Sequence, residues 1–119
     1  KLRIKGYHSS TGNPNFTINV KLGGTTIATG TGTSGNGSSD IFVIDVELTC
    51  RTTGGSGTVS AVGAWVEVHG TGENLGLIKI GTTTINTTSS LVLDATYAWG
   101  TADAGNTLTS QISTVEVLN

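Results

Sequence analysis

Few side chains in this sequence could act as catalysts or metal ligands. The two histidines, His8 and His69, are far apart at no spacing typical of zinc sites, and the single Cys50 cannot complete a cysteine–histidine cluster. No Gly-x-Ser-x-Gly motif of a serine hydrolase is present. Several of the eight carboxylates alternate with apolar residues, as solvated charges on strands do. We therefore expect no enzymatic activity, no catalytic residue, no cofactor and no metal site. A glycan-cleaving domain would need two carboxylates at one cleft.

One phosphate-binding motif occurs, but its context does not favour that function. Residues 30–35 match the Gly-x-Gly-x-x-Gly pattern of dinucleotide sites. That pattern works when a helix follows directly, because the helix N-terminus holds the pyrophosphate. Here more Gly, Asn and Ser residues follow, and then a strand pattern. We expect residues 29–40 to form a mobile surface loop without a bound cofactor.

The stretch Trp65-Val66-Glu67-Val68-His69 is a candidate binding surface. If Val66 and Val68 point inward, Trp65, Glu67 and His69 share the outer face of a strand. An exposed Trp between polar side chains could stack on a sugar or anchor a subunit interface. A weak two-ligand Glu/His metal site is a further alternative. Equally, a loop could cover Trp65, or the fold could bury both faces of this strand.

Two apolar residues lie on an otherwise polar strand face. Ile41 and Val43 alternate with an inward series and share their own face with charged residues further along. Large β-branched side chains there indicate a covered surface, and a second copy of the chain is the simplest cover. Together with Trp65, Glu67 and His69, these two residues form the predicted set of interface or glycan contacts.

Strands must position all of these residues. Val, Ile and Thr, which favour strands, number 41 of 119 residues, whereas no segment shows a helical period. Gly23 and Gly24 form a favoured two-residue hairpin turn. The alternation predicts inward series of Leu2, Ile4 and Gly6; Phe16, Ile18, Val20 and Leu22; Phe42, Ile44, Val46, Leu48 and Cys50; Val62, Ala64, Val66 and Val68; and Leu91, Leu93, Ala95, Tyr97 and Trp99.

The remaining segments complete the predicted fold. Short strands are expected at 76–80 and 82–87, and a last strand at 107–118 with a bulge near Ser113-Thr114. Cys50 is expected to be a buried, inert thiol. The chain is thus predicted to be all-β, one domain over residues 1–119, and an antiparallel two-sheet β-sandwich. We favour a jelly-roll-like arrangement over an immunoglobulin-like one, since the Cys…Trp…Cys spacing is missing.

Composition excludes several classes of function. The formal charge is −2 and there is no basic run, so we expect no nucleic-acid partner. No apolar stretch approaches the roughly 18–20 residues that span a bilayer, so we expect no membrane insertion. Thr, Gly, Ser and Asn make up 59 of the 119 residues, which supplies many neutral hydrogen-bonding groups. The chain begins at Lys1, already inside a strand pattern, and we expect it to be a fragment of a longer protein.

Several segments resemble bacteriophage and prophage virion proteins. The resemblance covers most of the chain, although residues 29–40 and 70–90 lie outside it. It rests on Leu2-Arg3-Ile4-Lys5-Gly6, Val20-Lys21-Leu22-Gly23-Gly24, Glu47-Leu48-Thr49-Cys50-Arg51-Thr52-Thr53-Gly54, Ser56-Gly57-Thr58-Val59, Leu93-Asp94-Ala95-Thr96, Trp99-Gly100-Thr101-Ala102, Asn106-Thr107-Leu108 and Val115-Glu116-Val117-Leu118.

The resemblance implies a β-sandwich module on the exterior of a phage particle. Such modules occur among tail-fibre, neck and head-decoration components, are often trimeric, and bring no enzymatic residues to this chain. The expected function is therefore a non-enzymatic structural or adhesive one. We expect a homotrimer that contacts other virion proteins and binds host-surface glycans weakly, with avidity from several copies. The alternative is a carbohydrate-binding module of a secreted bacterial enzyme, with Trp65 or Tyr7 as its stacking platform.

Overall fold

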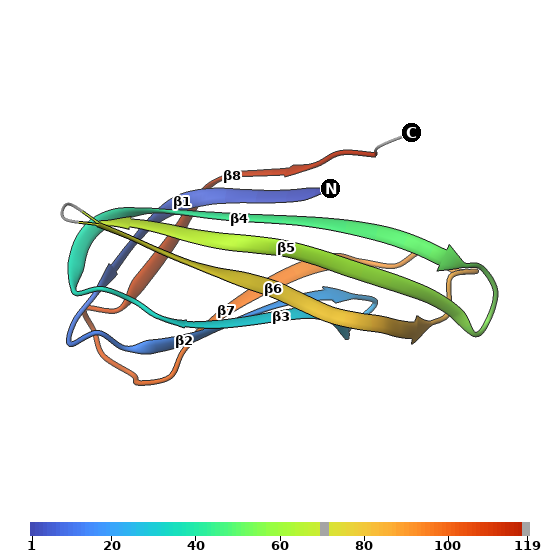
Figure 1. The fold of residues 1–119 in the computed structure, drawn as a ribbon, viewed down its shortest axis with the longest axis horizontal. Coiled ribbons are helices and arrows are strands. Elements are labelled where there is room, and N and C mark those ends of the chain that lie inside the picture. The colour runs from blue at the N-terminus through green and yellow to red at the C-terminus, as the bar shows by residue number, and fades with distance from the viewer. Residues whose placement is uncertain (70–71, 118–119) are drawn as a thin grey trace.

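The protein is all-β. The computed structural model describes residues 1–69 and 72–117, and this part of the chain contains no helix. It therefore has no helix long and apolar enough to cross a membrane. The molecule measures 46 × 27 × 20 Å, and its strands lie in two sheets that face each other (Figure 1). The strands are β1 (Leu2–Ser10), β2 (Asn15–Leu22), β3 (Thr25–Thr33), β4 (Gly37–Thr52), β5 (Gly57–His69), β6 (Gly72–Ile85), β7 (Leu93–Trp99) and β8 (Thr107–Val115).

Both sheets are antiparallel. The larger has the order β6-β5-β4-β1-β8 and the smaller has the order β3-β2-β7. The prediction of an antiparallel two-sheet sandwich is confirmed, while the preference for a jelly roll stays a prediction.

The two long sides of the sandwich differ. On one side Gly30 of β3 lies so close to Ile78 of β6 that a side chain on the glycine would meet it. On the other side β7 and β8 stand apart, and a cavity of about 300 Å³ lies between them. The apolar side chains that line this cavity are Leu2, Ile4, Phe42, Ile44, Leu93, Ala95, Tyr97 and Leu108.

The core forms where alternating apolar residues of the two sheets meet. Phe16, Ile18 and Val20 of β2 are buried against the inward residues of β4, because every second side chain on a strand points to the same face. Full burial of such a side chain stabilises the fold by about 1.5–3 kcal/mol. The inward series predicted for β1, β2 and β7 and for the first part of β4 are confirmed.

The β2–β3 hairpin is confirmed as well. Gly23 and Gly24 connect the paired residues Leu22 and Thr25 and have φ angles of 58° and 80°. Glycine adopts these angles without steric cost, and the resulting turn matches the twist of the two strands.

Residues 29–40 do not form the predicted mobile loop. Strand β3 continues to Thr33 and β4 begins at Gly37, so only three residues connect them, and Ser34 is fully buried. The prediction was wrong because these glycines occupy positions where the sheets approach closely. A side chain at Gly32 would overlap the indole ring of Trp65 and the ring of Phe16.

The structure also corrects the last part of the chain. The short strands predicted at 76–80 and 82–87 are one strand, β6, in which Gly81 is left unpaired at a bulge between the pairs Ala61–Ile80 and Ser60–Thr82. The bulge predicted near Ser113-Thr114 lies at Gln111 instead. Strand β8 ends at Val115, and the predicted end at Leu118 lies outside the described residues.

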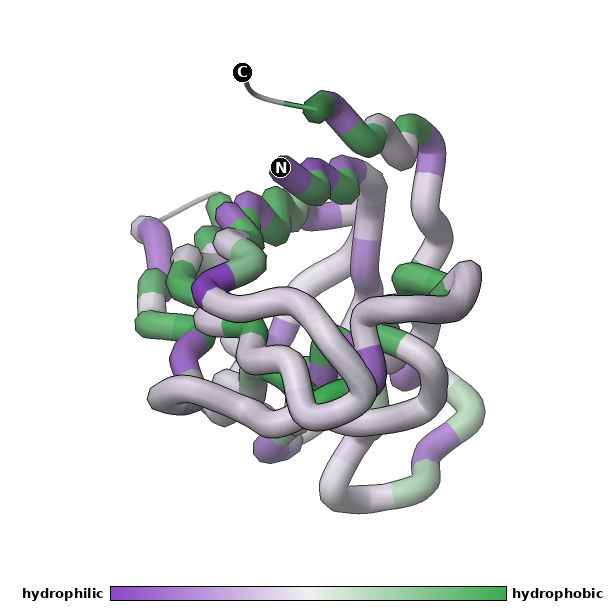
Figure 2. The backbone as a smooth tube through the Cα atoms, turned by 90° about the vertical axis from the view of Figure 1, so that its right-hand side faces the viewer, coloured by the Kyte–Doolittle hydropathy of each residue, from purple (hydrophilic) through white to green (hydrophobic). Residues whose placement is uncertain are grey.

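Cys50 is exposed rather than buried, and its thiol donates to the Thr52 carbonyl oxygen at 3.4 Å. The β4–β5 hairpin extends past the end of the smaller sheet, so no second layer covers this part of β4 (Figure 1). Figure 2 looks toward this end of the molecule, where the turns are neither strongly apolar nor strongly polar, and the strands behind them alternate between the two.

Candidate functional site

The two faces of β5 are opposite to the prediction. Trp65 is 4% exposed and Glu67 is 2% exposed, whereas Val62 and Val68 are 58% and 43% exposed. The prediction of outward Trp65, Glu67 and His69 is therefore wrong for this strand. The cause is its register with β4. Trp65 and Glu67 pair with the inward Ile44 and Phe42, and paired residues point to the same face of a sheet.

Trp65 belongs to an aromatic cluster between the sheets. Its ring meets Phe16 edge to face, with centroids 4.8 Å apart. Phe16 in turn stacks on Tyr97 at 4.8 Å, and Tyr97 meets Trp99 edge to face at 4.9 Å. Glycines at 32 and 76 leave the space that the indole fills. Trp65 is therefore a core residue, and it is not available as a stacking platform for a sugar.

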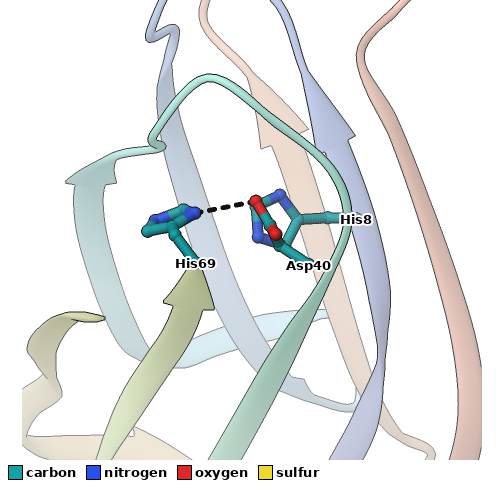
Figure 3. A group of neighbouring side chains, drawn as sticks. All are labelled: His8, Asp40 and His69. Carbon is teal, nitrogen blue, oxygen red and sulfur yellow. Dashed lines mark hydrogen bonds and ion pairs between the residues drawn. The ribbon is translucent and has the colours of Figure 1, made fainter. Parts of the chain in front are cut away.

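Beside the aromatic cluster, polar side chains gather at one end of the sandwich. We call this group the polar cluster, and Figure 3 shows three of its members, which come from β1, β4 and β5. Four of the side chains are buried, which is unusual for such polar groups. The polar cluster consists of His8, Ser10, Ser34, Asp40, Glu67 and His69.

His69 lies at the centre of the contacts in this cluster. Its Nδ1 is 2.8 Å from Asp40 Oδ2, so this nitrogen carries the proton and donates it to the carboxylate (Figure 3). Its Nε2 accepts from Asn74 Nδ2 at 3.2 Å and lies 3.6 Å from Glu67 Oε2. A Cβ at Gly35 would come within 2.8 Å of the imidazole, which explains why that position has no side chain.

His8 lies deeper in the same cluster. Its Nδ1 is 3.4 Å from Ser34 Oγ, and Ser34 Oγ is 3.1 Å from Ser10 Oγ. Its Nε2 is 3.7 Å from Glu67 Oε1. The imidazoles of His8 and His69 meet edge to face, with centroids 5.7 Å apart.

Burial shifts the protonation of these groups. It lowers the pKa of His8, with the Asp40 charge opposing that shift. It raises the pKa of Glu67, against the opposing influence of His69 and of the hydrogen bond that Tyr97 donates. Burial and the Glu67 carboxylate together raise the pKa of Tyr97. The contact between His8 and Glu67 therefore joins two groups whose neutral forms burial favours.

Two atoms in the polar cluster have no hydrogen-bond partner. These are His8 Nε2 and Glu67 Oε2, and Trp65 Nε1 nearby is also without one. A buried polar atom left unpaired costs about 1–3 kcal/mol. The polar cluster is thus incomplete as a hydrogen-bond network and has lone pairs to offer.

The order of Ser34, His8 and Glu67 is that of a serine–histidine–carboxylate triad. Ser34 and Glu67 are both almost fully buried, so an acyl substrate cannot reach the hydroxyl in this conformation. Asp40 and Glu67 likewise flank one imidazole as a carboxylate pair, but the burial of Glu67 denies a glycan access to it.

A second feature lies on the opposite face of the larger sheet. There Ile41 is exposed and Val43 is partly exposed, as predicted, and both pair with valines of β5. Leu75 and Leu77 of β6 continue the surface with exposed fractions of 67% and 63%. We call this surface the outer patch, and it consists of Ile41, Val43, Val62, Val66, Val68, Leu75 and Leu77.

Charged residues border the outer patch. On one side Arg3 Nε donates to Asp45 Oδ2 at 2.8 Å, and Lys1 Nζ lies 3.2 Å from Asp45 Oδ1. Partial burial acts to raise the pKa of Asp45, but hydrogen bonds and charge from Arg3 and Lys1 outweigh it and lower that pKa. Lys5, Glu73 and Lys79 complete the border at neighbouring register positions.

Sequence reasoning found part of both features. It placed Ile41 and Val43 on the outer face but assigned three β5 valines to the core, and it missed the two leucines of β6. Alternation of Leu75, Leu77 and Lys79 with Asn74, Gly76 and Ile78 was the available signal. It missed the polar cluster because His8, Asp40 and Glu67 lie on three different strands.

The outward series of β1 also includes Tyr7, which pairs with Ile41 and remains exposed. Tyr7 is the aromatic ring that stays available for a sugar among the two that the sequence suggested. No protein-family model, no curated protein and no solved structure matches this chain.

Proposed function

We propose that this chain is a non-enzymatic structural or adhesive module of a bacteriophage particle and that copies of it assemble through the outer patch. The outer patch is the observation that carries the proposal. Its largest side chains, Leu75 and Leu77, expose about two thirds of their surface on a flat sheet face. Contiguous apolar surface with a charged border is typical of a protein–protein interface.

The proposed occupant of the patch is a second copy of the chain. The border carries both signs of charge, with Lys5 and Lys79 on the positive side and Glu47 and Glu73 on the negative. A copy of the same face, suitably turned, can therefore pair lysines with carboxylates around an apolar centre. Apolar area removed from water stabilises such a contact by about 25 cal/mol per Å² before the costs of association.

The assignment to a phage particle is supported by the resemblance of the segments quoted above to virion proteins. We extend the proposal to a homotrimer on the exterior of the particle, in contact with other virion proteins. The Gly-, Ser- and Thr-rich turns at the end shown in Figure 2 would then be displayed in several copies. Weak contacts with host glycans would be strengthened by avidity.

The oligomeric state in solution tests the assembly. The full chain and a Leu75→Lys/Leu77→Lys double variant are compared by size-exclusion chromatography with light scattering over a range of concentrations. We expect an oligomer for the parent chain and a monomer with an unchanged circular dichroism spectrum for the variant. Thr82→Lys/Thr84→Lys, at exposed positions of the same strand outside the patch, is the matched control and should leave the oligomer intact.

A parent chain that stays monomeric at about millimolar concentration would refute assembly through this patch. So would a double variant that still forms the oligomer. A monomer that binds glycans in a Tyr7-dependent way, tested with Tyr7→Ala, would instead favour the carbohydrate-binding alternative. Genes for head, neck or tail proteins on either side of this one would support the assignment to a particle.

A further inference from the structure

We propose that the polar cluster binds one divalent transition-metal ion, with Zn²⁺ as the type, through His8, Asp40, His69 and Glu67. This inference is independent of the proposed assembly, since it concerns the inner face of the larger sheet and not the outer patch. The site would join β1, β4 and β5 at the end of the sandwich shown in Figure 3.

The spacing of the ligand atoms is the first observation. One ligand atom each from His8, Asp40 and His69 lies within 4.8 Å of the others. Glu67 spans the two imidazoles, with Oε1 3.7 Å from His8 Nε2 and Oε2 3.6 Å from His69 Nε2. Ligand atoms around tetrahedral zinc lie about 3.3 Å apart, so binding requires the side chains to close by about an ångström.

The unpaired atoms are the second, independent observation. His8 Nε2 and Glu67 Oε2 have no hydrogen-bond partner, although His8 is 1% and Glu67 2% exposed. Both belong to side chains that face each other and His69. A cation placed among them would accept a lone pair from each, which removes the two defects of this network together.

The existing hydrogen bonds also prepare the imidazoles to bind a metal. A metal-binding histidine commonly has a partner at its other ring nitrogen, which fixes the tautomer and the orientation of the ring. His8 has Ser34 Oγ at Nδ1, and His69 has carboxylates or the Asn74 amide at its two nitrogens. The ligands come from strands of the core, so the site needs little ordering when it binds.

The donor set selects the class of metal. Two imidazoles and two carboxylates suit Zn²⁺ and its neighbours among the first-row transition metals, whereas Mg²⁺ and Ca²⁺ prefer oxygen ligands only. The two carboxylates also balance the charge of a divalent ion inside the protein. Cys50 is exposed in the β4–β5 hairpin and takes no part.

Isothermal titration of the EDTA-treated, dialysed full chain with ZnCl₂ tests the site. We expect one ion per chain and a thermal unfolding midpoint that rises by several degrees with zinc. His69→Gln and Glu67→Gln should each weaken zinc binding at least tenfold while the circular dichroism spectrum stays the same. Asp45→Asn, a carboxylate on the same strand as Asp40 but on the outer face, is the control and should bind zinc like the parent chain.

Co²⁺ in place of Zn²⁺ gives a second measurement. Four-coordinate Co²⁺ absorbs visible light strongly, so an intense band that Glu67→Gln abolishes would support the four-residue set. A weak band typical of six-coordinate Co²⁺ would overturn it. The proposal also fails if the parent chain does not bind Zn²⁺ at about 0.1 mM. Equal affinity in the parent and both cluster variants would likewise show that bound zinc lies elsewhere on the surface.

Discussion

The two faces of β5 have the opposite composition to that of an ordinary sandwich strand. Its inner face near His69 holds a tryptophan and a buried glutamate, and its outer face holds valines that are exposed to solvent. The inner face is stable because its polar groups contact one another and its indole packs against Phe16. The outer face has no such partner within the chain. Hydrophobicity alone therefore does not determine which face of this strand is buried.

Trp65→Ala should have the largest effect and would break the comparison if it did not. Removal of a buried indole leaves a cavity, so we expect a loss of about 3–5 kcal/mol in the free energy of unfolding. Val62→Ala on the outer face of the same strand should change it by about 0.5 kcal/mol or less. Urea denaturation followed by far-ultraviolet circular dichroism, at a concentration where the chain is monomeric, measures both. Equal losses would mean that the two faces do not differ in burial.

Gly32→Ala tests the close approach of β3 to the aromatic cluster. The added methyl group would overlap the indole of Trp65, so we expect a loss of about 1–3 kcal/mol in stability. Gly55→Ala is the control, because nothing lies near a Cβ at that position. The same denaturation experiment compares the two variants. If Gly32→Ala were as mild as Gly55→Ala, the packing of β3 on β5 would be looser than described.

The smallest effect is expected at the charged border of the outer patch. Arg3 and Lys1 hold the pKa of Asp45 below its usual value in spite of partial burial, which acts in the opposite direction. A carboxylate whose pKa is lower in the folded state stabilises the fold above its unfolded pKa. That stabilisation is lost as the pH falls through the folded pKa.

Asp45→Asn should therefore cost about 0.5–1 kcal/mol at neutral pH. Near pH 2 it should cost almost nothing. Denaturation curves of the parent and the variant at both pH values give the difference. Glu47→Gln, which removes a more exposed and more distant partner of Lys1, should cost less at neutral pH. A penalty for Asp45→Asn that does not change with pH would show that the ion pairs are not its cause.

The sequence predicted the strands better than their orientation. Alternation located β1, β2 and β4 and the turn at Gly23-Gly24, because in those strands one face is apolar and the other is not. In β5 both faces contain apolar residues, so the pattern shows a strand without showing which face is inside. The register with β4 decides this, and register depends on contacts between distant segments.

Glycine caused the second error. A run rich in Gly, Ser and Thr is typical of a loop, yet in β3 the glycines at 30 and 32 allow close contact between the sheets. A sequence cannot distinguish a glycine that bends the chain from one that makes room for Trp65. Similarly, the polar cluster could not be predicted from spacing, because strand pairing and turns bring together residues that are up to 61 positions apart, as His8 and His69 are.

Strand β8 has a consequence for how the domain opens. It pairs only with β1, most of its residues are exposed, and the cavity separates it from β7. Its loss would break one ladder and leave the aromatic cluster and the polar cluster in place. Local unfolding should therefore begin at the C-terminal strand and expose the unpaired edge of β1. In a longer protein or an assembly, that edge is where a strand from a neighbour could pair in its place.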